Sequence, residues 1–181
     1  YIWEGGLAIW GAVIGAVLAV GVWALLKRRN VGFILDAIAP AAALGMAVGR
    51  LACVITGDAM GRETTGPFGF AYTNPGAMVP QLGVYYTPTP VFEIILNLSI
   101  FAVLWRLRKR ELPSGALFLL FIALYSVGRF VITFWSLYQT IAFGLNQAQL
   151  ISIAAFIIAV PSLFVLFRRG QAALPASPAT H

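Results

Sequence analysis

Charged residues are scarce in this chain, and their scarcity is the most informative feature of its composition. Only 10% of the 181 residues are Asp, Glu, Lys or Arg, whereas a soluble domain carries about 25%. Hydrophobic residues make up 60% of the chain and the mean hydropathy is +0.88. Because so few charges cannot cover a water-facing surface, we expect a membrane protein whose solvent is the lipid bilayer.

Cysteine and histidine are also nearly absent. Cys53 is the one cysteine, which excludes an intrachain disulfide, and the one histidine is His181, the last residue. A histidine-based catalytic triad within this chain is therefore excluded, and no metal site is expected. Since no histidine can act as its base, Cys53 is interpreted as a packing residue rather than a nucleophile.

Five apolar stretches approach or reach the length of about 20 residues that a membrane-spanning helix needs. They run from about Leu7 to Leu26, Val31 to Gly57, Pro90 to Trp105, Ala116 to Leu137 and Ala148 to Phe167. We predict an all-α, polytopic bundle of five helices over 1–170, followed by a disordered tail over 171–181. The chain enters an apolar run directly from Tyr1, so further helices are expected upstream of it.

Basic residues predict how the bundle is oriented. Nine of the twelve lie after the first, third and fifth stretches: Lys27, Arg28, Arg29, Arg106, Arg108, Lys109, Arg110, Arg168 and Arg169. Because Lys and Arg accumulate on the cytoplasmic side, the amino end is predicted outside and the carboxy end in the cytoplasm. This arrangement accounts for much of the net charge of +6, so nucleic acid is not expected as a partner.

Three arginines are left unexplained by that pattern. Arg62 lies in the outer linker, whereas Arg50 and Arg129 lie within apolar stretches. At about 1.5 Å per residue, both begin roughly 12–14 Å below the outer surface. A charge at such depth is costly and usually marks a functional path. One interpretation is a cationic pocket for a lipid phosphate, and the other is structural pairing with buried carbonyls or with Glu93 or Asp58.

The carboxylates divide into two groups by predicted depth. Asp58 and Glu93 lie near the outer ends of the second and third helices, where either could orient an arginine or accept a proton. Asp36 and Glu111 lie near the cytoplasmic side and are expected to be solvated or interfacial. The turn-rich linker from Gly57 to Pro90 is expected to lie over the mouth of the pocket.

Five segments, in order, resemble the motifs of the prolipoprotein diacylglyceryl transferase family. The segment from Gly49 to Arg62 is similar to the signature G-R-x-G-N-F-x-N-x-E-x-x-G-R. The other four are Gly5–Gly15, Thr87–Glu93, Gly115–Phe118 with Tyr125 and Gly128–Phe130, and Gln149–Ser152. The resemblance extends over nearly the whole chain.

This resemblance implies a membrane enzyme of the bacterial plasma or inner membrane. The family transfers a diacylglyceryl group from phosphatidylglycerol to the lipobox cysteine of a preprolipoprotein, releases glycerol phosphate and needs no metal or diffusible cofactor. Matching positions imply catalytic roles for Arg50, Arg129 and Asp58. They also imply substrate binding by Arg50 and by the residues at four further positions, namely Trp10, Gly61, Arg62 and Glu93.

Several positions depart from the family pattern. Cys53 and Thr56 stand in place of two asparagines, Asp58 replaces a glutamate, and Trp10 replaces the histidine of some members. Other departures are Thr87, Phe92, Thr133 and Ser136. Because polar partners of the arginines are lost, the alternative is a non-catalytic relative that binds anionic lipid or signal peptides. The general base is left open between Asp58, Glu93 and a group upstream.

Overall fold

The computed structural model describes residues 18–24, 26–27, 30–137, 140–142 and 144–172. Its named helices are α2 (Val31–Thr56), α3 (Thr89–Leu107), α4 (Ala116–Ile132) and α5 (Gln147–Ala172), and a further helical segment covers 18–24. Four helices are long and apolar enough to cross a membrane, α4 doing so together with the 3₁₀ turn η1 (Thr133–Trp135). They correspond to the second to fifth predicted spans, whereas most of the first lies outside the described residues.

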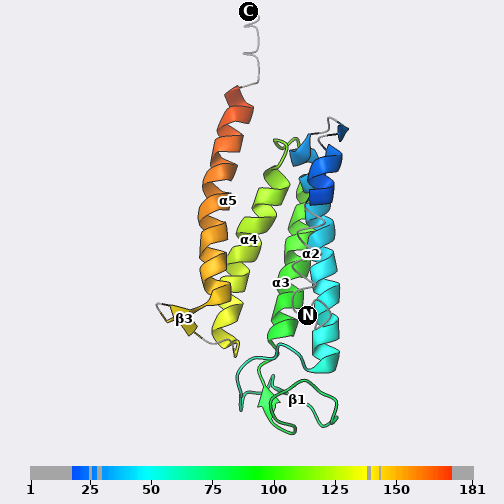
Figure 1. Cartoon of the computed structure of the whole chain (residues 1–181), viewed down its shortest axis with the longest axis vertical. Helices are drawn as coiled ribbons and strands as arrows, with labels where there is room; N and C mark the ends of the chain where they lie inside the picture. The colour runs from blue at the N-terminus through cyan, green and yellow to red at the C-terminus, as the bar shows by residue number, and fades with distance from the viewer. Residues whose placement is uncertain (1–17, 25, 28–29, 138–139, 143, 173–181) are drawn as a thin grey trace, which may run out of the picture.

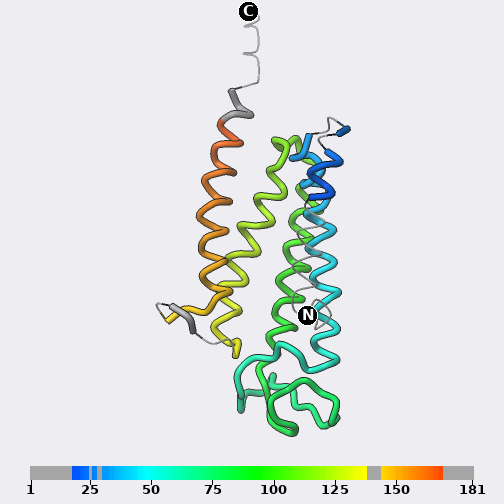
Figure 2. The backbone as a smooth tube through the Cα atoms, in the orientation of Figure 1, coloured from blue at the N-terminus to red at the C-terminus, as the bar shows by residue number. Residues whose placement is uncertain are grey.

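The helices run side by side and alternate in direction (Figure 1). The starts of α2 and α4 and the ends of α3 and α5 lie at one end of the bundle, and the loop that carries β1 lies at the other (Figure 1). The smooth trace in Figure 2 shows the linker between α2 and α3 folded beneath these two helices. The clusters after α3 and at the end of α5 therefore share one end, as the alternation predicts, and we call it the basic end.

The core joins α2, α3 and α4. Ala39 and Ala43 of α2 are fully buried with Ile100 and Leu104 of α3, and Leu117 and Phe121 of α4 complete the cluster. Small side chains on α2 allow α3 to approach closely, which favours dispersion contacts between helices in a bilayer. Many large apolar side chains remain exposed, with Ile55 at 80% and Ile158 at 68%, as expected of helices whose outer faces meet lipid rather than water.

Helix boundaries differ modestly from the predicted ones. Asn30 caps α2 by accepting a hydrogen bond from the Gly32 amide, and Gly57 ends it in the left-handed conformation. Proline in the first turn starts α3 at Thr89, one residue before the predicted start. At the other end of the chain, α5 continues to Ala172, two residues into the predicted tail, and 173–181 lie outside the described residues.

Asp36 is half-buried at the basic end of the bundle, which agrees with the interfacial position expected of it. Its carboxylate accepts hydrogen bonds from the Gly115 amide at 2.6 Å and the Phe118 amide at 2.9 Å. Those amides belong to the start of α4, where backbone N–H groups lack helical partners and the helix dipole favours an anion. Asp36 therefore attaches α2 to α4 at the basic end.

Short strands occur in the linker between α2 and α3, where only turns were expected, and in the loop between α4 and α5. β1 (Phe70–Ala71) pairs antiparallel with β2 (Tyr85–Tyr86), and β3 (Thr140–Ala142) pairs with β4 (Leu145–Asn146). An isolated bridge joins Gly61 to Ser136. The linker after α2 is thereby tied to the segment after α4.

Candidate functional site

The two deep arginines meet at one carboxylate. Arg50 Nε contacts Glu93 Oε2, and Arg129 Nη1 contacts Glu93 Oε1. Three helices supply these groups: Arg50 comes from the last two turns of α2, Glu93 from the first turns of α3 and Arg129 from the last turn of α4. The two arginines thus meet at one depth, as predicted, and they pair with Glu93 and not with Asp58. This pairing is the structural alternative stated from the sequence, and the binding of a lipid phosphate stays a prediction.

Burial decreases from Glu93 to the arginines. The exposed fraction of the side chain is 4% for Glu93, 13% for Arg129 and 24% for Arg50. An unpaired buried charge costs several kcal/mol, which explains why the carboxylate engages both guanidinium groups. We call Arg50, Glu93 and Arg129 the triad. With Glu93 ionised the triad keeps a formal charge of +1, so its electrostatics favour an additional anion.

A close approach of α3 and α4 brings the triad together. Gly128 precedes Arg129, and a Cβ added there would overlap the side chain of Leu96 on α3. The absence of a side chain at Gly128 lets Arg129 reach Glu93 across the interface. Each charge is also placed favourably for the dipole of its own helix. The Glu93 carboxylate lies near the start of α3, and the two guanidinium groups come from near the ends of α2 and α4.

Asn97 was not singled out from the sequence. Its side chain is fully buried one turn after Glu93, and its Nδ2 donates to the Glu93 carbonyl oxygen at 2.8 Å. A lone amide four residues after a glutamate in an apolar helix is the signal that could have identified it. Asn97 fills the interior beneath the triad with a polar group and holds the backbone that carries Glu93.

Gly61 and Arg62 join the linker after α2 to the segments before α3 and after α4 through backbone hydrogen bonds. The Gly61 amide donates to the Thr87 carbonyl at 2.8 Å, and the Arg62 amide donates to the Trp135 carbonyl at 2.8 Å. A Cβ at Gly61 would overlap the Trp135 carbonyl oxygen, so this position accepts only glycine without a shift of backbone. The exposed Arg62 side chain donates from Nε to the Ser136 carbonyl at 3.4 Å.

Thr89 and Tyr72 fix the linker to the helix ends. Thr89 Oγ1 donates to the Ala59 carbonyl at 2.6 Å, and the Tyr72 hydroxyl donates to the Val54 carbonyl at 2.5 Å. Burial raises the pKa of Tyr72 above its ordinary value near 10, which keeps this hydroxyl a donor. These bonds hold the linker after α2 over the end of that helix.

Asp58 and Trp10 are not brought to the triad by any described contact. Asp58 is exposed, and its Oδ1 accepts a hydrogen bond from the adjacent Ala59 amide at 2.8 Å. Its predicted catalytic role stays a prediction. Trp10 lies outside the described residues, so its predicted part in substrate binding has no structural counterpart here.

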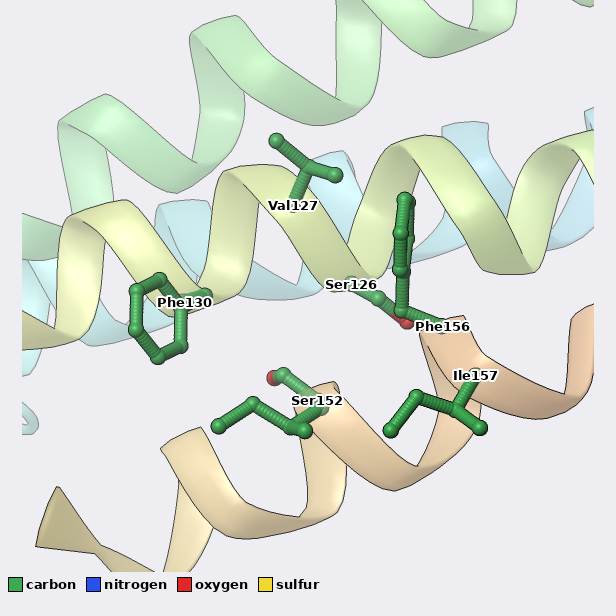
Figure 3. Close-up of a pocket in the computed structure, with 7 residues that line it drawn as sticks. Ser126, Val127, Phe130, Ser152, Phe156 and Ile157 are labelled. Carbon is green, nitrogen blue, oxygen red and sulfur yellow. The ribbon is translucent and has the colours of Figure 1, made fainter. Parts of the chain in front are cut away.

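An apolar cavity lies between α4 and α5, near the level of Arg129 along α4. It has a volume of about 190 Å³ and is lined by Ser126, Val127 and Phe130 of α4 and by Ser152, Ile153, Phe156 and Ile157 of α5. Figure 3 shows side chains of both helices around this space. Ser152 Oγ donates to the Ala148 carbonyl at 2.7 Å, so its hydroxyl hydrogen is used within its own helix and the lining stays largely apolar.

Known proteins match this chain over most of its length. The family model "Prolipoprotein diacylglyceryl transferase" matches residues 1–165. The chain belongs to this family. Phosphatidylglycerol–prolipoprotein diacylglyceryl transferases from Dehalococcoides mccartyi strain 195 and Corynebacterium diphtheriae are 37% and 39% identical over 91% and 93% of this chain. The chain spans 62% and 64% of the length of these two relatives.

Positions that depart from the signature of the diacylglyceryl transferases nevertheless contact arginines. Arg50 Nη1 donates to Cys53 Sγ at 3.6 Å, and Thr87 Oγ1 donates to the Arg62 carbonyl at 3.0 Å. The Thr133 hydroxyl donates to the Arg129 carbonyl, and Ser136 contributes its carbonyl to Arg62. Of these four contacts, only that of Cys53 joins a departing side chain to a guanidinium group. The two hydroxyls bond to arginine backbone carbonyls, and the Ser136 carbonyl belongs to the backbone, so these contacts do not replace side-chain partners of the guanidinium groups.

Proposed function

We propose that this family member transfers a diacylglyceryl group from phosphatidylglycerol to the lipobox cysteine of preprolipoproteins. The observation that carries the proposal is the convergence of Arg50 and Arg129 on buried Glu93, which leaves a formal excess of one positive charge. Four candidate membrane spans and membership of a membrane-bound transferase family support the bacterial plasma membrane as its location. Preprolipoprotein signal peptides and phosphatidylglycerol are the proposed partners.

The chemistry requires a cation where the phosphate departs. The cysteine sulfur forms a bond to the terminal glycerol carbon of the diacylglyceryl group, and the bond from that carbon to the phosphate oxygen breaks. Glycerol phosphate leaves with the electron pair of this bond, and the thiol proton passes to a base or to the leaving group. Negative charge on the phosphate grows in this step, so a preorganised guanidinium lowers the barrier.

Glu93 acts in this proposal as a positioning residue. Both of its oxygens contact guanidinium groups, which fixes their forks before substrate binds and reduces the entropy lost on phosphate capture. The same contacts occupy the carboxylate, so it is poorly placed to take the thiol proton. Asp58, with its exposed side chain near the end of α2, is the better candidate for that base within the described residues.

The cavity between α4 and α5 is proposed to receive part of an acyl chain. Phe130 of its lining follows Arg129 directly, so the cavity lies at the level of the triad. A cavity of about 150 Å³ lined by apolar groups accepts a small hydrocarbon in another protein. Phosphatidylglycerol bound in this way places its phosphate near Arg129 and an acyl segment beside Phe130.

The test measures glycerol phosphate released from phosphatidylglycerol in membranes containing the protein, with a lipobox peptide as acceptor. Arg50→Ala and Arg129→Ala should each reduce release by about 100-fold or more. Arg106→Ala, which removes a charge at the basic end, is the matched control and should keep activity. Undiminished release by both triad variants would contradict the proposal. Phosphatidylglycerol binding without any release by the unaltered protein would favour the non-catalytic alternative.

A further inference from the structure

A second cavity lies at the basic end of the bundle, away from the triad. It has a volume of about 810 Å³ and is enclosed by α2, α3, the segment after α3 and the start of α4. Asp36 lines it, and Asp36 precedes Arg50 by fourteen residues on α2. At about 1.5 Å per residue these two levels are roughly 21 Å apart. The α2 lining residue nearest to Arg50 is Leu44, six residues earlier and roughly 9 Å along the helix. The cavity and the candidate site have no lining residue in common, since none of the three triad residues lines the cavity.

The lining of the cavity is apolar in one part and cationic in another. Phe33, Leu44 and Phe101 contribute apolar surface from α2 and α3. Lys109 and Arg110 contribute positive charge from the segment that follows α3, and both are exposed. An amphipathic lining of this kind at a membrane boundary matches the two parts of a phospholipid, whose acyl chains need apolar contacts and whose phosphate needs cations.

Arg108 and Trp105 add a fixed contact to this lining. The Arg108 guanidinium carbon lies 3.4 Å from the centroid of the Trp105 ring, a cation–π arrangement, and both residues line the cavity. Stacking orients the guanidinium group and reduces the side-chain entropy that ligand binding would otherwise remove.

The one carboxylate of the lining is already occupied. Asp36 accepts hydrogen bonds from the Gly115 and Phe118 amides at the start of α4. Three cationic side chains and one carboxylate line the cavity, which leaves a formal excess of two positive charges. Because Asp36 neutralises the helix start rather than the cations, this excess is available to an anion from outside the protein.

We propose that this cavity binds an anionic phospholipid from the leaflet at the basic end of the bundle. Its phosphate lies against Lys109 and Arg110, and its acyl chains lie along Phe33 and Phe101. A soluble phosphate compound would gain nothing from the apolar part of the lining, and a zwitterionic lipid would bring its own cation toward Lys109. The proposal does not depend on diacylglyceryl transfer.

Trp105 provides a local readout of occupancy. The purified protein is mixed with phosphatidylglycerol or phosphatidylcholine that carries brominated acyl chains, and tryptophan fluorescence is recorded. Bromine quenches only at short range, and comparison with Trp105→Phe isolates the signal of this residue from that of the other four tryptophans. Lipid bound at the triad does not contribute to this difference, so failure of the proposed transferase activity would not alter the result.

The decisive comparison uses two double variants that each remove two positive charges at the basic end. Lys109→Gln with Arg110→Gln alters the lining, and Arg106→Gln with Arg168→Gln alters residues outside it. The first pair should raise the phosphatidylglycerol concentration that gives half-maximal quenching of Trp105 by about 10- to 30-fold. The second pair should raise that concentration by no more than about threefold.

Three results would overturn the proposal. Equal quenching by brominated phosphatidylglycerol and phosphatidylcholine would mean that the cavity selects no anion or is covered by protein. An equal loss in both double variants would mean that overall charge, and not the cavity, attracts the lipid. Displacement of the brominated lipid by millimolar glycerol phosphate would identify a site for soluble anions instead.

Discussion

At the scale of single residues, Glu93 links three helices through one carboxylate. Its carboxylate contacts the guanidinium groups of Arg50 and Arg129 and is almost completely buried. Removing the shared partner would leave two cations close together in a low-dielectric interior, where desolvation is no longer offset. The same residue therefore matters for stability and for the arrangement of the proposed phosphate site.

Replacement of Glu93 by glutamine tests this conclusion. Glu93→Gln keeps the shape of the side chain but removes its charge. Breaking a buried ion pair costs about 3–5 kcal/mol. Because Arg50 is partly exposed, we expect the free energy of unfolding to fall by about 3 kcal/mol, the lower end of that range. Thermal unfolding in detergent measures the change. Glu111→Gln removes a carboxylate from the exposed segment after α3 and should have little effect. A Glu93→Gln melting temperature equal to the unaltered value would refute the stabilising role of the triad.

Gly61 tests the junction between the linker after α2 and the segment after α4. Gly61→Ala places a methyl group against the Trp135 carbonyl, and the resulting shift should cost about 1–3 kcal/mol. Gly76→Ala, in the same linker, meets only Asn74 Oδ1 at 3.5 Å and serves as the control. Limited proteolysis of the linker should accelerate in the first variant and remain unchanged in the second. Equal proteolysis rates would show that the linker adjusts without penalty.

At the scale of elements, the start of α5 is held by a reciprocal cap. The Asn146 amide donates to Gln149 Oε1 at 3.1 Å, and the Gln149 amide donates to Asn146 Oδ1 at 2.9 Å. Two backbone donors at a helix start are thereby satisfied, as in a capping box. The motif that begins at Gln149, noted first as a resemblance, thus has a structural explanation in which Gln149 caps the helix beside the α4–α5 cavity.

Substitution of Asn146 measures the strength of this cap. Asn146→Ala should destabilise the first turn of α5 by about 1 kcal/mol and raise amide hydrogen exchange there several-fold. Gln147→Ala changes an exposed residue in the same turn and leaves both cap bonds in place. Similar exchange in these two variants would mean that packing on α4, and not the cap, holds the start of α5.

At the scale of the whole molecule, alternating helices place the basic clusters at one end and the α2–α3 and α4–α5 loops at the other (Figure 1). Which of these two ends faces the cytoplasm stays a prediction from the positive-inside pattern. The proposed transferase depends on it, because the lipobox cysteine of a secreted preprolipoprotein must reach the triad from the outer side. The orientation also determines which leaflet supplies lipid to the basic-end cavity.

Cysteine labelling in intact cells determines this orientation. In a Cys53→Ser background, Gly76→Cys places a thiol in the linker after α2, and Glu111→Cys places one between α3 and α4; both positions are exposed. A membrane-impermeant thiol reagent should modify the first in intact cells and the second only after permeabilisation. The reverse pattern would require the amino end to lie in the cytoplasm and would remove the proposed access of the preprolipoprotein.

The sequence by itself determined the membrane class, the approximate spans from Val31 onward and the shared end of the basic clusters. Hydrophobic length and charge placement are local properties, so they can be read without knowing any contact. The match of the signature arginines to Arg50 and Arg129 also came from local motifs. The predicted roles of these arginines in catalysis, and that of Asp58, remain predictions.

Only the tertiary structure decided how these residues combine. The sequence left Arg50 and Arg129 with several possible partners, because pairing across α2, α3 and α4 depends on helix rotation and on the close approach that Gly128 permits. The attachment of Asp36 to the start of α4 spans 79 positions in the chain and left no local signal. Contacts between distant segments depend on packing geometry, which no single stretch of sequence contains.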